Sequence, residues 1–236
     1  MVDFDYGSEE VVDPGAEFKN PEIGDHTAVL RSLIHCGLFR ESYRGKVKKP
    51  APEVVAIFEL KDEEDMEDDG VTPLELHKSF PLKKGDRSFM TKFIKVFDPK
   101  GKATGFDDFI GKPCQITAKG SKALNEDGTP KYVNFGGISG LPPKFAKMIE
   151  PLTVKGVGHV PFQELTKEAI LELNPVLEVA NILMKGERYK GSKAEKIIEN
   201  IRVENPEFAK VEEKEESKPE GAKEEVETDL KEEEEF

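Results

Sequence analysis

One helical pattern interrupts a run of strand patterns, and its position along the chain limits the possible folds more than any other feature. Phe89, Phe93 and Phe97 stand four residues apart, which is the spacing of one helix face, and Ser88 or Asp86 precedes them as a cap. Elsewhere between 26 and 139 the apolar residues alternate or run continuously, which predicts strands at 26–39, 53–60, 74–82, 114–120 and 132–139. Three strands, a helix and two strands predict a mainly β protein with some α structure, a five-stranded barrel of the OB-fold type.

The rest of the chain predicts three further segments around this barrel domain, which we place at 25–150. Residues 1–24 are polar and contain prolines and glycines, so we expect a flexible N-terminal arm. Residues 151–206 carry three short helix patterns, at 164–173, 175–186 and 191–202, and form an α-helical extension. Residues 207–236 are rich in Glu and Lys and are predicted to be a disordered acidic tail.

The negative charge of the chain is concentrated in that tail. The whole chain carries −13, and residues 207–236 contribute −9 of it through fourteen acidic and five basic residues. Residues 1–206 are therefore nearly balanced, and a negative total does not exclude a nucleic-acid partner for the body of the protein.

Basic residues interleaved with aromatic rings mark the two loops with which an OB barrel binds ligands. The loop after the first strand holds Phe39, Arg40, Tyr43, Arg44, Lys46, Lys48 and Lys49. The loop between the last two strands, with its flanks, holds Lys119, Lys122, Lys131, Tyr132 and Phe135. Between them in the chain stand Lys83, Lys84 and Arg87. Cations follow a phosphate backbone and flat rings stack on unpaired bases, so these residues predict a single-stranded DNA surface. The alternative is that the lysines are ordinary solvated side chains and the rings, Phe135 above all, belong to the core.

No pattern of an enzyme or a resident metal is present. The sequence lacks GxSxG, Walker, HExxH and GxGxxG motifs, so we expect a protein that is not an enzyme and needs no cofactor. The acidic run at 61–70 lacks the order of an EF-hand and is interpreted as a solvated hairpin tip rather than a metal site. The four histidines are scattered, and each is expected to be structural.

The order of these segments resembles phage single-stranded DNA-binding proteins with an OB-fold. The stretches that carry the resemblance are HTAVLRSLIHCG, the Y-R-G-K loop, VVAIFEL, the lysine-bearing FPL segment, FDPKGKATGFDDFIGKPC, KYVNFGGIS followed by LPP, and PVLEVANILMKGERYKGSK. The resemblance implies a protein that coats single-stranded DNA in replication, recombination and repair. It leaves open whether the protein is a monomer or a homodimer, and whether the basic stretch 187–193 adds to the DNA surface.

The tail shares a further feature with that family. Its tip is Glu232, Glu233, Glu234, Glu235 and Phe236, and it has no proline or aspartate near the end as the common bacterial version does. In the family such a tip docks into replication and repair enzymes, and the resemblance implies a polymerase, helicase-primase or nuclease as partner. The ring and the free carboxylate coincide only at the last residue, so one pocket can bind both.

Two other functions are compatible with the pattern. The first is a scaffold protein whose barrel binds protein while the tail keeps it in solution, and the second is a DNA-metabolising enzyme with a metal held by the acidic run. Cys36 and Cys114 form no CxxC or zinc pattern, which fits a reducing cytoplasm, the host's if the gene is a phage gene. The polar N-terminus and the lack of long apolar runs predict neither a secretory signal nor a membrane helix.

Overall fold

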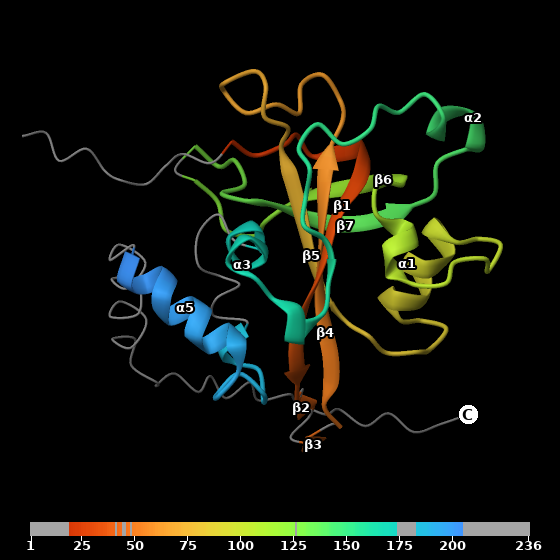
Figure 1. The fold of residues 1–236 in the computed structure, drawn as a ribbon. Helices are drawn as coiled ribbons and strands as arrows, with labels where there is room; N and C mark the ends of the chain where they lie inside the picture. Colours follow the sequence, from red (N-terminus) through yellow and green to blue (C-terminus); the bar gives the residue numbers. More distant parts are fainter. Residues whose placement is uncertain are drawn as a thin grey trace, which may run out of the picture.

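The protein is built mainly from one antiparallel sheet with a few helices on it (Figure 1). The computed structural model describes residues 19–40, 42–43, 46–47, 49–125, 127–173 and 183–204, with the backbone alone for 42, 43 and 46. The strands of the main sheet are β1 Gly24–Phe39, β4 Ala51–Leu60, β5 Glu75–Pro81, β6 Pro113–Gly120, β7 Val133–Ser139 and β8 Gly158–Val160. The helices are α1 Phe89–Phe97, α2 Pro143–Ala146, α3 Lys167–Leu173 and α5 Lys193–Glu204. None of the described helices is long and apolar enough to cross a membrane.

The long strand β1 organises the sheet, whose order is β5-β4-β1-β6-β7. Its first part, Gly24–Val29, pairs with β6, and the part from Ala28 to Phe39 pairs with β4. The register shifts twice along the β4 pairing, between Leu30 and Ser32 and between His35 and Gly37. Such irregularities bend a strand, which lets β1 take part in both halves of the sheet.

The sheet is open between β5 and β7, so the closed barrel expected from the sequence is not formed. A side chain of α1 packs between these two strands, at the place where a closed barrel has backbone hydrogen bonds. The ring of Phe89 in α1 lies 4.8 Å from that of Phe80 in β5 and 5.6 Å from that of Phe135 in β7, between ring centroids. Because aromatic packing fills the space between the two edges, the core is closed there without hydrogen bonds between the strands.

The predicted helix is confirmed, together with its cap. The hydroxyl of Ser88 accepts a hydrogen bond from the backbone N–H of Thr91, 3.2 Å away, and Phe93 and Phe97 are buried. The five predicted strands are present, each within two residues of its expected bounds. Two pieces of strand structure were not predicted: β8, which pairs in parallel with β1, and a small hairpin formed by β2 Ser42–Tyr43 and β3 Lys46–Val47.

The C-terminal segment packs on the outer face of the sheet and forms a second apolar cluster there (Figure 1). Ile34, Val55 and Ile57 of the sheet contribute to this cluster, and Leu173 and Ile198 contribute from α3 and α5. Two of the three predicted helices, 164–173 and 191–202, correspond to α3 and α5. The third, 175–186, lies mostly outside the described residues, as do the predicted arm up to residue 18 and the tail from residue 205.

Candidate nucleic-acid interface

The strand pairing brings two of the three predicted basic groups to one end of the sheet. Phe39 at the end of β1 lies opposite Ala51 at the start of β4, and Pro81 at the end of β5 lies opposite Glu53. The loop after β5 is tied to the start of β4, because the backbone N–H of Leu82 donates to the carbonyl of Pro52 at 2.7 Å. The loop after β1 and the loop after β5 therefore leave the sheet at the same end.

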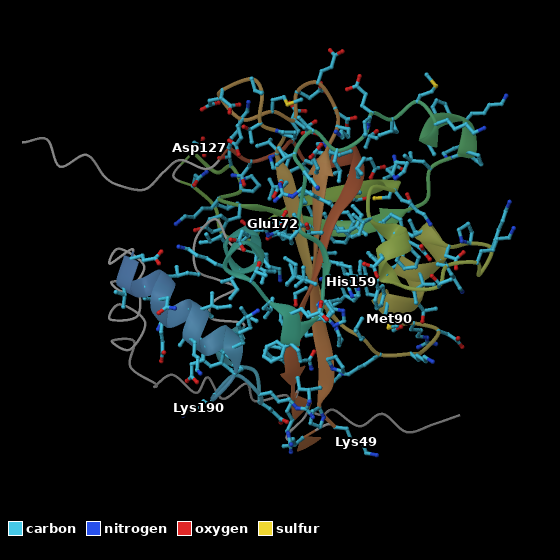
Figure 2. All side chains as sticks on the ribbon, viewed as in Figure 1. Lys49, Met90, Asp127, His159, Glu172 and Lys190 are labelled. Carbon is cyan, nitrogen blue, oxygen red and sulfur yellow. The ribbon has the colours of Figure 1, made fainter. Side chains whose placement is uncertain are left out.

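The C-terminal segment adds basic residues to this end. The N–H of Glu187 donates to the carbonyl of Leu38 at 2.8 Å, and its carboxylate accepts from Nε of Arg40 at 2.5 Å. Figure 2 shows Lys49 and Lys190 in the lower part of the same view. We use the name basic end for the described cations of the loops after β1 and β5 and of the adjoining stretch 187–190: Arg40, Lys49, Lys83, Lys84, Arg87, Arg188 and Lys190.

Four predicted residues of the first loop cannot be placed in this surface by their side chains. Arg44 and Lys48 lie outside the described residues, and Tyr43 and Lys46 are described by their backbone alone. The backbone of these two belongs to the β2–β3 hairpin, where Tyr43 pairs with Lys46. The tail residues predicted to bind partners, Glu232 to Phe236, also lie outside the described residues.

The third predicted group lies at the opposite end of β1. Gly24, the first residue of β1, pairs with Ala118 beside Lys119, whereas the basic end begins at Phe39. With a rise of about 3.3 Å per residue, the 16 residues of β1 separate the two ends by roughly 50 Å along the strand. Lys119, Lys122, Lys131 and Tyr132 are exposed there, with Nζ of Lys131 5.5 Å from the centre of the Tyr132 ring. The two predicted ligand loops therefore do not form one continuous surface.

Two of the predicted aromatic residues pack against the protein itself. The Phe135 ring lies 5.5 Å from that of Phe58, stacked on it, and also contacts Phe89. Phe39 is half-buried against the C-terminal segment, near Gly186. Their contacts are those of core residues, which is the alternative that the sequence left open for them. Tyr132, with 54% of its surface exposed, has a ring open to solvent.

The outer face of β1 and β4 is covered by the C-terminal segment. In an OB-fold the face of the second and third strands binds the ligand, together with the neighbouring loops. Here Val55 and Ile57 are buried under the C-terminal segment, and Arg31 links the sheet to Glu172 of α3. What remains accessible at this side is the basic end, where the covering segment itself contributes Arg188 and Lys190.

The acidic run at 61–70 is only partly the solvated tip expected from the sequence, because Asp65 is 1% exposed. Its Oδ2 lies 2.7 Å from Nδ1 of His26, which is also buried. Nε2 of His26 lies 2.8 Å from the carbonyl of Glu22 and must donate to it, since a carbonyl only accepts. The Nδ1–Oδ2 contact therefore needs one shared proton. The oxygen of Asp62 is 3.7 Å from Nδ1, so these three residues are the described group that could surround a cation.

The pKa values of this pair move in the direction that a shared proton requires. Burial works to lower the pKa of His26, but the bonds to Glu22 and Asp65 outweigh it and raise that pKa above 6.5. Burial raises the pKa of Asp65, which His26 only partly offsets. At 2.7 Å the two atoms form a complete hydrogen bond, so the pair is satisfied by a proton without a metal ion.

Linkage then predicts that the protein loses stability as the pH rises above about 6.5. Because the pKa of His26 is higher in the folded protein than in the unfolded chain, folding favours the protonated form. Its contribution to stability is complete at a pH below 6.5, the pKa of the unfolded chain, and is lost as the pH rises through the pKa of the folded protein. In urea unfolding between pH 6.5 and 8.5, His26→Gln should have a flatter dependence on pH than the unchanged protein. The control is His77→Gln. Burial lowers the pKa of His77 to about 4, so the contribution of His77 to the free energy of unfolding changes only between about pH 4 and 6.5. Equal slopes for His26→Gln and the unchanged protein above pH 6.5 contradict the shared proton.

No protein-family model, curated protein or solved structure matches the chain. The resemblance to phage single-stranded DNA-binding proteins thus depends on the order of motifs in the sequence.

Proposed function

We propose that the protein binds single-stranded DNA without catalysing a reaction, and coats it during replication, recombination and repair. The observation that carries the proposal is the basic end, where three segments far apart in the sequence bring cations together. Of these cations, Arg40 is paired with Glu187, whereas Lys49, Lys84 and Arg87 form no ion pair within the described residues. Cations left unpaired at one place on a nearly balanced body are what binding a phosphate backbone requires.

The fold supports the proposal in a general way. The order of three strands, a helix and two strands is that of an OB-fold, although the sheet is open. In this proposal the acidic tail with Phe236 at its tip recruits a polymerase, helicase-primase or nuclease. It also competes weakly with DNA for the basic end, because opposite charges attract at low salt.

The test is a fluorescence titration of oligo-dT with the full chain. If about four phosphates are contacted, affinity should fall about 50-fold between about 50 and 200 mM salt, with little dependence on base sequence. Duplex DNA of the same length should bind much more weakly. A chain ending at Pro206 should bind oligo-dT more tightly than the full chain, because the competing tail is removed. Lack of oligo-dT binding at low salt in both chains would refute the proposal.

A scaffold protein is the second candidate, and one observation favours it. The outer face of β4, one of the two strands that OB-folds use for ligands, is covered by the protein's own C-terminal segment. If the protein binds no DNA, the open surfaces at the two ends of β1 become candidate surfaces for a protein partner.

A further inference from the structure

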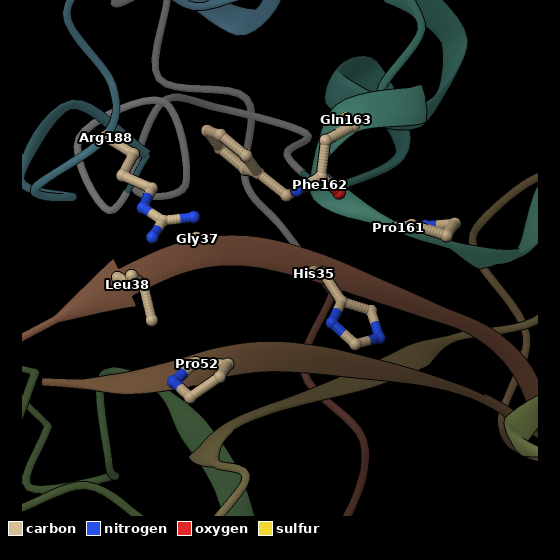
Figure 3. A pocket seen from close by; sticks show the side chains of 8 residues that line it. All are labelled: His35, Gly37, Leu38, Pro52, Pro161, Phe162, Gln163 and Arg188. Carbon is tan, nitrogen blue, oxygen red and sulfur yellow. The ribbon is translucent and has the colours of Figure 1, made fainter.

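A pocket of about 310 Å³ lies beside the basic end, between the sheet and the C-terminal segment. Its lining residues are His35, Gly37, Leu38, Pro52, Pro161, Phe162, Gln163 and Arg188. Figure 3 shows Phe162 and Arg188 on one side of it, facing the strands that carry Leu38 and Pro52. Its volume is at the lower limit of pockets that bind small molecules, so it suits a group of the size of one nucleotide.

The strand is shaped to receive the ring of Phe162. Gly37 has a φ of +105°, and a Cβ at this position would lie 3.2 Å from a carbon of the Phe162 ring. Gly37 also stands at one of the two register shifts between β1 and β4. Because no side chain intervenes, the half-buried ring lies directly against the strand and forms an apolar wall of the pocket.

The polar groups around the pocket suit a ligand with a flat ring and a negative charge. Arg188 is exposed and forms no ion pair within the described residues, since the neighbouring Glu187 is bonded to Arg40. His35 is bonded to His159, with 3.0 Å between their Nε2 atoms. Burial, and then the electrostatic effect of His159, lowers the pKa of His35 to about 4, so at neutral pH the imidazole of His35 is uncharged. Arg188 is therefore the charged residue of the pocket lining at neutral pH, and the other lining residues are neutral.

We propose that this pocket binds one unpaired base of the DNA strand, with the base against Phe162 and the adjoining phosphate at Arg188. This inference depends on the proposed function and identifies one of its contacts. The loop after β1 starts beside Leu38 and returns beside Pro52, and both residues line the pocket. A DNA strand that is bound at the basic end therefore passes the opening of the pocket. Apolar and aromatic walls next to cations are the arrangement that binds unpaired bases.

The test compares oligo-dT with a strand of the same length and charge in which every base is replaced by an abasic unit. The unchanged full chain should bind oligo-dT about tenfold more tightly than the abasic strand, because stacking requires a base. Phe162→Ala should lose about tenfold in affinity for oligo-dT and none for the abasic strand. Arg188→Gln should weaken both strands and reduce the salt slope by about 0.7. The matched control is Phe145→Ala, which should change neither affinity. This residue is 59% exposed and belongs to α2, which Figure 1 shows far from β2 and β3.

The outcomes separate the failure of the pocket from the failure of the proposed function. If the unchanged protein binds neither strand, both proposals are overturned. If it prefers oligo-dT and Phe162→Ala retains that preference, the pocket alone is overturned. Phe162→Leu fills a similar space without a flat ring. If Phe162→Ala does not fold, the preference for oligo-dT over the abasic strand is measured with Phe162→Leu instead, and the same loss is expected. The third measurement is calorimetry with thymidine monophosphate. If this nucleotide binds in a way that depends on Phe162, while the binding of oligo-dT does not depend on Phe162, the pocket is a site for free nucleotides and the proposal is overturned.

Discussion

Replacing Lys49, Lys84 and Arg87 by Glu should lower the affinity for oligo-dT by on the order of 100-fold at low salt. The three residues belong to the two loops that the pairing of β1, β4 and β5 brings to one end of the sheet. None of them has an ion-pair partner within the described residues, so each is available to a phosphate. Each lost contact removes about 0.7 from the slope of log affinity against log salt, so the slope should fall by about 2.

The control must change the net charge by the same amount at another place. Lys144, Lys147 and Lys155 are exposed. The first two lie in or next to α2, which Figure 1 shows far from β2 and β3, and Lys155 adjoins Gly156, which lies against Arg31 and Ser32 in the middle of β1. Their replacement by Glu adds the same repulsion to the whole protein, so only a small loss of affinity is expected. Similar losses in the two triple variants would mean that net charge alone governs binding, and the basic end would not be the interface.

The elements around the core were predictable because local periodicity determines them. The four-residue spacing of Phe89, Phe93 and Phe97 identified α1, and Ser88 identified its start. The closure of the sheet was not predictable in this way, since apolar alternation shows which face is buried but does not show which edge strands pair. Strand β8 has three residues and pairs with residues of β1 that stand 126 positions earlier in the sequence, so it has no local signal.

The candidate site was predictable by residue type but not by placement. The basic loops stood out in the sequence, yet only the pairing of β4 with β1 and β5 shows that two of the groups meet, and only the pairing of β1 with β6 shows that the third is remote. Asp65 looks like its acidic neighbours in the sequence, and only the position of His26 explains its burial. The pocket at Phe162 had one available signal, an isolated glycine within a strand pattern, which often marks a close approach of another group.

A mostly buried ion pair links the C-terminal segment to the sheet. Nε of Arg31 donates to Oε1 of Glu172 at 2.7 Å, and the same guanidinium is paired with Glu75 of β5. The side chains of Arg31 and Glu172 are 12% and 8% exposed. The carboxylate of Glu172 also accepts from the hydroxyl of Ser32 at 3.0 Å and from the N–H of Val157 at 2.9 Å. One cation therefore balances two carboxylates from different parts of the chain.

Arg31→Met should destabilise the protein by about 3–5 kcal/mol, since it leaves two carboxylates near each other without their cation. Urea unfolding at neutral pH measures the loss. Arg40→Met removes an exposed pair with Glu187 and should leave the unfolding free energy nearly unchanged. Adding Glu172→Gln to Arg31→Met should restore part of the loss, because the amide removes one of the stranded charges. If Arg31→Met is no more harmful than Arg40→Met, the pair does not hold the segment. If the loss is as large as expected, the segment that supplies Arg188 to the basic end is attached to the sheet by a charge network as well as by its apolar contacts.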